Sequence, residues 1–215
     1  MVRGVVWHRY DLRLRDNVAL SEAGNQAMPV YIFDPKWLEN SLVSDTRIEF
    51  VMECLKDINR QYIIKGSRIS LLYGDPIEEL ENLKQKGYDI YFNKDANHFR
   101  QEMEQQAREK FQGFSGDGVV RNKEGTRKKW RNSARKYFQS KPPKIPESFE
   151  DNPIKNEITL DEVREKHNIS PEKEKFGKGG GQEAGKRLQS FLDNIKKYPS
   201  SISSPIKAEK NTSHL

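Results

Sequence analysis

Four short apolar runs in the first 95 residues are each followed by side chains that could bind a polar ligand. The runs span residues 4–8, 28–33, 68–73 and 88–93, and the residues that follow them are Arg9 and Asp11, Asp34, Asp75, and Asn93 with Asp95. Guanidinium, carboxylate and amide groups supply hydrogen-bond donors and acceptors for such a ligand. If the runs are parallel strands, their carboxyl ends meet at one edge of a sheet, where open α/β sheets bind ligands. We therefore expect a binding site at this edge.

The common motifs for phosphate binding and nucleophilic catalysis are absent from the sequence. No GxGxxG follows the first apolar run and no GxxxxGK[ST] occurs, which argues against a dinucleotide site and a P-loop. The lack of GxSxG argues against an α/β-hydrolase. His8, His98, His167 and His214 lack metal-ligand spacing, so we expect structural or solvent-exposed roles for them. The single cysteine, Cys54, rules out a disulfide framework, and we expect it to be unreactive on a helix.

Helix-like segments alternate with the four apolar runs. We expect a short helix over 17–26, a long helix capped by Asp45 or Thr46 and stopped by Gly66, a helix from Pro76 to about residue 87, and a charged helix over about 97–111. Residues 119–120 could form a remnant fifth strand. Alternation with short connections predicts βαβ units, and hence a parallel sheet with helices on both faces.

The positive charge is concentrated in one short segment. The 215-residue chain has a formal net charge of +6, yet residues 1–120 hold 16 Lys and Arg against 19 Asp and Glu. Residues 121–144 hold ten Lys and Arg against one Glu, interleaved with Trp130, Tyr137 and Phe138. Such a segment is either a basic helix that packs its aromatic side chains on the sheet or a surface that binds nucleic-acid phosphates. We expect part of it to be helical, with an end at Pro142-Pro143.

The rest of the chain is polar. Residues 141–178 include Pro146, Pro153 and Pro171, which is typical of a linker, and a helix with one apolar stripe is expected from Gln182 to about Tyr198. Hydrophobic residues make up 34% of the chain and charged residues 33%, so we expect part of it to be extended. Mean hydropathy is −0.94 and no apolar run approaches the ~20 residues of a membrane span. We expect a cytoplasmic protein that does not bind membranes.

Several segments resemble the DNA photolyase and cryptochrome family. Residues 5–20 read VVWHRYDLRLRDNVAL, close to the family's opening V-W-F-R-x-D-L-R-x-x-D-N-x-A-L, with His8 in place of the usual Phe. Further similar blocks follow in order: PVYIFDP at 29–35, RIEFVMECL at 47–55, GSRISLLYGDP at 66–76, YFNKDANHF at 91–99, GGGQEAGKRLQSFLDNIKKY at 179–198 and TSHL at 212–215. Residues 96–98 depart from the family's Tyr-Glu-Pro, and residues 113–176 show little similarity.

The resemblance implies a fold and a domain plan. The fold would be an α/β, Rossmann-like parallel sheet of about five strands in the order 3-2-1-4-5, with helices on both faces, followed by a linker and a C-terminal helix. The domains would be an α/β antenna domain at 1–140, a linker at 141–178 and the start of an FAD-binding helical domain at 179–215.

The resemblance also implies a function. The chain would be the N-terminal part of a monomeric, light-dependent DNA repair protein similar to deoxyribodipyrimidine photo-lyase, a carbon–carbon lyase that meets damaged DNA through its helical domain. An antenna chromophore, a deazaflavin or methenyltetrahydrofolate, would contact Arg9, Asp11, Asp34, Arg47, Asn93 and Asp95. The FAD phosphates would contact Tyr198, Thr212 and Ser213.

No catalytic residue and no metal ligand is assigned to this chain. Because most of the family's FAD domain would follow residue 215, we expect the chain alone neither to hold FAD nor to repair DNA. Two alternatives stay open: a cryptochrome-type blue-light receptor without repair activity, and a stand-alone Rossmann-like protein that binds nucleotides or RNA. Nucleic acid is also a candidate partner for residues 121–144.

Overall fold

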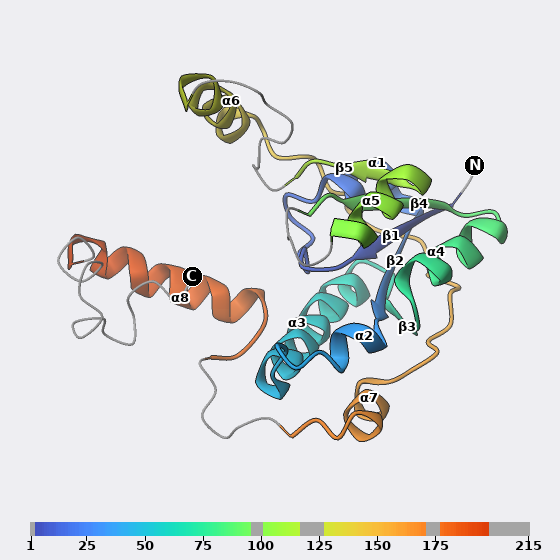
Figure 1. Cartoon of the computed structure of the whole chain (residues 1–215). Helices are drawn as coiled ribbons and strands as arrows, with labels where there is room; N and C mark the ends of the chain where they lie inside the picture. Colours follow the sequence, from blue (N-terminus) through green and yellow to red (C-terminus); the bar gives the residue numbers. More distant parts are fainter. Residues whose placement is uncertain (1–2, 96–100, 117–126, 171–176, 198–215) are drawn as a thin grey trace.

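Five parallel strands form one sheet in the order β3-β2-β1-β4-β5, which confirms the predicted fold class and strand order. The computed structural model describes residues 3–95, 101–116, 127–170 and 177–197. The strands are β1 Gly4–His8, β2 Ala27–Phe33, β3 Ser70–Tyr73, β4 Asp89–Asn93 and β5 Gln112–Phe114 (Figure 1). The fifth strand was predicted too late in the chain, because its short QGF segment lacks an apolar pattern. Residues 119–120 lie outside the described residues.

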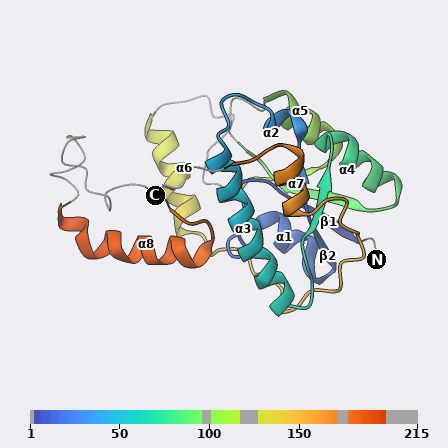
Figure 2. The same ribbon diagram turned by 90° about the horizontal axis from the view of Figure 1, so that it is seen from below.

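The helices cover both faces of the sheet and continue beyond it (Figures 1 and 2). They are α1 Val18–Ala23, α2 Pro35–Leu38, α3 Asp45–Ile64, α4 Pro76–Gln85, α5 Gln101–Lys110, α6 Arg127–Gln139, α7 Leu160–Lys166 and α8 Gly181–Asn194, with 3-10 turns η1 Gly24–Gln26 and η3 Ile195–Lys197. Ser44 caps α3, not Asp45 or Thr46 as predicted, because its hydroxyl lies where it accepts the Arg47 N–H. None of the helices in the described ranges is long and apolar enough to span a membrane.

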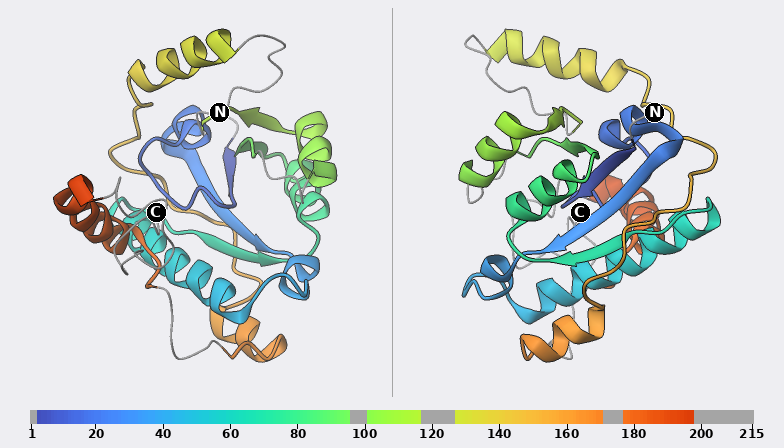
Figure 3. Two further views of the ribbon diagram at one scale, coloured as in Figure 1. Left: turned by 60° about the vertical axis from the view of Figure 1, so that its left-hand side comes forward. Right: turned by 90° about the vertical axis from the view of Figure 1, so that its right-hand side faces the viewer.

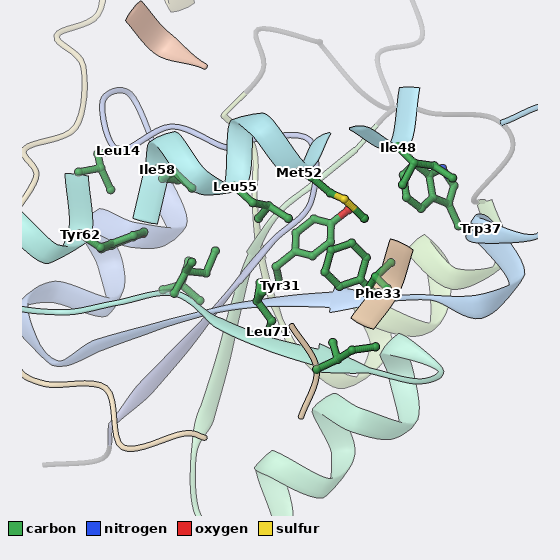
Figure 4. Close-up of a cluster of buried hydrophobic side chains, with 14 of the residues drawn as sticks. Leu14, Tyr31, Phe33, Trp37, Ile48, Met52, Leu55, Ile58, Tyr62 and Leu71 are labelled. Carbon is green, nitrogen blue, oxygen red and sulfur yellow. The ribbon is translucent and has the colours of Figure 1, made fainter. Parts of the chain in front are cut away.

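Alternation along the strands divides the core in two. In β2, Tyr31 and Phe33 point to the face covered by α1 and α3, whereas Val30 and Ile32 point to the face covered by α4 and α5. Because both faces are covered, all seven residues of β2 are buried. The side chains with which α3 covers its face are Ile48, Met52, Leu55, Ile58 and Tyr62 (Figure 4).

Residues 145–169, within the predicted linker, pack against the α/β core. Phe149, Ile158 and Val163 are buried with the α3 side of the sheet. Asn152 is fully buried, and its side-chain amide donates to the carbonyl oxygens of Pro29 (2.9 Å) and Arg68 (3.0 Å). This segment therefore runs along the β3 edge and protects it. The boundary at residue 140 stays a prediction, but ordered packing on the α/β unit continues past it.

The glycine run at 179–181 attaches α8 to α3. The backbone N–H of Gly179 donates to Glu53 Oε2 (2.7 Å), and that of Gly181 donates to Asp57 Oδ2 (2.9 Å). A Cβ on Gly179 would lie 2.5 Å from the Phe50 carbonyl oxygen, so the close approach requires glycine. Helix α8 begins at this contact and then leaves the sheet layers (Figures 1 and 2).

Candidate functional site

A cavity of about 810 Å³ lies at the carboxyl ends of β1, β2 and β3, the edge at which the sequence predicts a site. The loops after these strands, the start of α3 and one side of α5 surround it. Its lining residues are Tyr10, Asp34, Lys36, Trp37, Asn40, Leu42, Val43, Arg47, Asp75, Pro76, Ile77, Gln101, Glu102, Met103 and Gln106. Of the six residues predicted to contact a chromophore, Asp34 and Arg47 line the cavity.

Capped helices place two of the carboxylates that line the cavity, Asp34 and Asp75. Asp34 precedes Pro35 at the start of α2 and accepts the backbone N–H of Lys36 (2.9 Å). Asp75 caps α4 in the same way through the Ile77 N–H (3.0 Å), and it also pairs with the Lys36 ammonium (2.9 Å). Burial opposes ionisation of Asp75, but the hydrogen bond from Lys36 holds its pKa below the ordinary value. Both carboxylates are thus fixed acceptors at the mouth of the cavity.

Among the described residues that line the cavity, Arg47 is the cation whose side chain stays available. Arg47 lies in the first turn of α3 and is exposed. Its side chain forms no hydrogen bond or ion pair with any residue that the structure describes. By contrast Lys36 is engaged by Asp75, as its raised pKa reflects. Trp37, 9% exposed, supplies a flat apolar wall.

Arg9, Asn93 and Asp95 belong to a different, buried cluster. The guanidinium of Arg9 donates to Glu104 Oε2 (2.7 Å) and to the Asn93 carbonyl oxygen (2.5 Å). It also lies 4.6 Å from the centre of the Trp7 ring, a cation–π contact. The backbone N–H of Asp95 donates to the other oxygen of Glu104 (3.0 Å). These groups fasten α5 to the ends of β1 and β4, and none of them lines the cavity.

Asp11 and Asn93 form the centre of a second buried network. The side-chain amide nitrogen of Asn93 donates to Asp11 Oδ2 (2.6 Å) and to Asn17 Oδ1 (2.7 Å), and its side-chain oxygen Oδ1 accepts the Ala19 N–H (3.1 Å). Burial alone would raise the pKa of Asp11, but the neighbouring His8 ring and the hydrogen bonds from Arg9 N–H and Asn93 lower it. Asp11 therefore serves as a structural acceptor that holds the loop after β1.

The histidines that the structure describes have structural partners, in line with the prediction. His8 is fully buried and its Nε2 lies 2.6 Å from the Tyr62 hydroxyl. His167 Nε2 lies 3.0 Å from the hydroxyl of Tyr73. His98 and His214 lie outside the described residues, as do the predicted FAD-phosphate contacts Tyr198, Thr212 and Ser213.

Sequence reasoning missed the residues that line the cavity from α2 and α5. Lys36 and Trp37 follow Asp34-Pro35, and an Asp-Pro pair after a strand is itself a signal for a capped helix start. Asp75 was recognised as a residue after a strand but was not assigned to the site. The α5 residues Gln101 and Glu102 carry no local signal, because only the packing of α5 brings them to the cavity.

Residues 4–121 match the family model described as DNA photolyase. The chain belongs to the DNA photolyase family. It is 34% identical over 94 residues to a deoxyribodipyrimidine photo-lyase of Synechococcus sp., a match that covers 41% of this chain and 19% of that protein. It is 31% identical over 93 residues to cryptochrome-1 of Anopheles gambiae, which covers 38% of this chain and 17% of that protein.

Solved structures confirm the fold. The chain superposes on a class III photolyase from Agrobacterium tumefaciens with a TM-score of 0.68 and 21% identity, covering 94% of this chain and 47% of that one. A photolyase from Sulfolobus tokodaii, described with two FAD molecules and a novel light-harvesting cofactor, gives a TM-score of 0.62 and 22% identity, covering 87% and 45%. The chain thus spans about half the length of these structures and matches under a fifth of the two curated relatives named above.

Proposed function

We propose that this chain provides the light-harvesting, chromophore-binding domain of a light-dependent DNA repair protein of the deoxyribodipyrimidine photo-lyase type. The observation that carries the proposal is the cavity at the carboxyl ends of β1 to β3. Its volume of about 810 Å³ falls within the range of roughly 300–1,000 Å³ that is usual for small-molecule sites. It lies outside the carboxyl ends of the strands, the edge at which open α/β sheets bind ligands.

The residues of the cavity fit a flat, polar chromophore such as a deazaflavin or methenyltetrahydrofolate. Trp37 offers an apolar wall for a ring system, and Asp34 and Asp75 offer fixed acceptors for ring N–H groups. The available guanidinium of Arg47 would bind a carbonyl edge or an anionic tail. When bound, the chromophore would absorb light and pass the excitation energy on. The protein's part is to hold and orient it.

The wider role is also a proposal. In the full protein FAD would carry out the electron transfer and a helical domain would bind damaged DNA, with the protein acting as a cytoplasmic monomer. Cryptochromes also occur among the relatives, and an antenna role would serve either class. We further propose that residues 1–215 alone neither retain FAD nor repair DNA. They supply three of the expected FAD contacts, Tyr198, Thr212 and Ser213, whereas the other contacts would come from the rest of the helical domain.

The test is to titrate the purified 215-residue chain separately with a reduced deazaflavin, methenyltetrahydrofolate and FAD, and to monitor binding by the fluorescence of the ligand. We expect one of the first two to bind, and Arg47→Ala to weaken that binding by about tenfold or more, as expected for loss of a charged hydrogen bond. Arg60→Ala is the matched control, because Arg60 is also exposed on α3 and lies outside the cavity.

Two outcomes would contradict the antenna proposal. One is no binding of any of the three ligands by a chain with an intact circular dichroism spectrum. The other is binding that Arg47→Ala and Arg60→Ala change equally. The Sulfolobus tokodaii photolyase is described with two FAD molecules. If the unchanged chain binds FAD and the Arg47→Ala variant does not, FAD is the ligand of the antenna cavity. FAD retained by Arg47→Ala as by the unchanged chain, or light-dependent repair by residues 1–215, would refute the expected inactivity of the chain.

A further inference from the structure

Helix α6 is a strongly basic element with no function in the antenna site. Its 13 residues, RKKWRNSARKYFQ, contain six Lys and Arg and no Asp or Glu. Arg131, Arg135 and Lys136 are exposed, and none of them forms an ion pair with a residue that the structure describes. Other arginines of the chain have carboxylate partners, as Arg9 and Arg164 do. The charges of Arg131, Arg135 and Lys136 are therefore uncompensated within the part of the chain that the structure describes.

The position of α6 leaves these cations accessible. The helix projects from the sheet layers in Figure 1 and in both views of Figure 3. Arg131 and Arg135 are four residues apart and lie on one side of the helix, with Lys136 adjacent. Ala134 is buried and Tyr137 half-buried, so the helix has a covered side and a cationic, solvent-facing side. The family match ends at residue 121, before α6 begins.

We propose that α6 binds the phosphodiester backbone of duplex DNA, independently of base sequence and of any lesion. Clustered cations without counter-charges release the counterions of DNA when they bind its phosphates, which supplies most of sequence-independent affinity. Arginine suits this contact, because its guanidinium can bind two phosphate oxygens at once. The contact would add to lesion recognition by holding undamaged duplex near the protein.

An anionic membrane is the other surface that a basic helix could meet, and the composition of α6 disfavours it. Membrane affinity of such helices grows with the apolar area that inserts below the headgroups. α6 has no aliphatic side chain larger than that of Ala134, which is buried. The exposed aromatic side chains are Trp130 (53%) and Phe138 (76%), and Tyr137 is half-buried. The cationic side chains of α6 outnumber the apolar side chains that could insert into a bilayer, which favours binding to DNA phosphates over binding to a membrane.

The proposal goes beyond the antenna role and does not depend on it. The three cations lie outside the cavity, so undamaged duplex would bind whether or not the cavity holds a chromophore. A chain that fails to bind chromophore but binds duplex through α6 would refute the antenna proposal alone. A chain that binds chromophore but not duplex would refute the α6 proposal alone.

The experiment measures binding of the 215-residue chain to a fluorescein-labelled, undamaged duplex by anisotropy across a salt series. If Arg131, Arg135 and Lys136 each neutralise one phosphate, they contribute a slope of about −2.7 in log K against log salt. That slope corresponds to a loss of about 40-fold in affinity between roughly 50 and 200 mM salt. We expect the triple variant Arg131→Ala/Arg135→Ala/Lys136→Ala to lose this share of the slope.

The control removes the same charge elsewhere, with Arg15→Ala/Arg60→Ala/Lys86→Ala, since these three side chains are exposed and form no ion pair within the described residues. We expect the control to keep the salt slope of the unchanged chain. Equal slopes for the two triple variants would overturn the proposal. So would binding to single-stranded DNA alone that is lost in Phe138→Ala, or binding to phosphatidylserine-containing vesicles without binding to duplex.

Discussion

The buried pair of His8 and Tyr62 gives the sharpest test of how the core is held together. Both side chains are fully buried, and His8 Nε2 lies 2.6 Å from the Tyr62 hydroxyl oxygen. The other ring nitrogen, Nδ1, lies 3.2 Å from the backbone carbonyl oxygen of Asp11, which can only accept. Nδ1 therefore carries the hydrogen, and Nε2 accepts the proton of the Tyr62 hydroxyl. The pair joins β1 to α3 across the core.

Removing one partner leaves the other buried without its hydrogen bond. Tyr62→Phe leaves Nε2 of His8 without a donor, and His8→Phe leaves the hydroxyl of Tyr62 without an acceptor. Each loss costs roughly 1–3 kcal/mol in the free energy of unfolding, because a buried polar group is then neither bonded nor hydrated. Phe is the residue that the family usually has at position 8, so its ring is a reasonable replacement in shape. Tyr88→Phe is the control, because Tyr88 is half-buried and its hydroxyl forms no hydrogen bond within the described residues.

The double variant His8→Phe/Tyr62→Phe removes both polar groups together. We expect it to cost less than the sum of the two single variants by about 1–2 kcal/mol, since no unpaired ring nitrogen or hydroxyl remains. Urea unfolding at pH 7.5, monitored by circular dichroism, measures the unchanged chain, the two single variants, the double variant and the Tyr88→Phe control. Additive costs of the two single variants would refute the hydrogen bond as a coupled, stabilising pair.

The same pair predicts a pH dependence of stability. Burial holds the pKa of His8 below its ordinary value of 6.5, so the folded chain takes up this proton at lower pH than the unfolded chain does. The contribution is fully present above about pH 6.5 and is lost as the pH falls below it, with a slope of at most about 1.4 kcal/mol per pH unit. The stability difference between the unchanged chain and His8→Phe should therefore shrink from pH 7.5 to pH 5. A constant difference over that range would refute a neutral, buried His8.

Two further predictions concern single side chains, that of the buried Asn152 and that of the partly buried Cys54. Asn152→Ala removes the donors to the carbonyl oxygens of Pro29 and Arg68 and should lower the free energy of unfolding by roughly 2–4 kcal/mol. The control Asn82→Ala, on the exposed side of α4, should change it by under about 0.5 kcal/mol. Equal effects of the two variants in urea unfolding would contradict the bridging role of Asn152. Burial raises the pKa of the Cys54 thiol, so a thiol reagent at pH 7.5 should react slowly with the folded chain and quickly in urea, and equal rates in the two conditions would contradict this.

The sheet could be predicted because its information is local. Each of the first four strands is a short apolar run, and their alternation with helices leaves few topologies for a parallel sheet. The strand order then came from the family resemblance. The fifth strand was misplaced, since Gln112–Phe114 is three residues long and is recognised as a strand only by its pairing with β4.

The packing of residues 145–169 could not be predicted from their pattern. Their buried apolar residues, Phe149, Ile154, Ile158, Val163 and Ile169, are spaced by polar residues and prolines with no steady helical or strand period. The segment is also held by hydrogen bonds to backbone groups and side chains of β3 and α3, which lie far away in the sequence. The capping box of α7, with Thr159 and Glu162, was a local signal that could have located this helix.

The place of the candidate site was predictable, but the use of its residues was not. Side chains after parallel strands must gather at one edge of the sheet, and they do. Whether such a side chain meets a ligand depends on partners that sequence reasoning does not supply. Arg9 is bound by Glu104, which lies 95 residues away on α5, whereas Arg47 has no such partner in the described ranges.

The location of the cavity follows from which of the residues after the strands are already hydrogen-bonded to each other and which are not. The strand order reverses between β1 and β4, and a ligand would be expected in the crevice there. In this chain Arg9, Asp11 and Asn93, which stand at the ends of these two strands, form hydrogen bonds to one another, and Arg9 also donates to Glu104. Charged groups that are buried and fully paired in this way cannot be released to a ligand without a large cost. The space for a ligand is therefore displaced toward the ends of β2 and β3, where its polar lining includes the helix caps Asp34 and Asp75 and the unengaged guanidinium of Arg47.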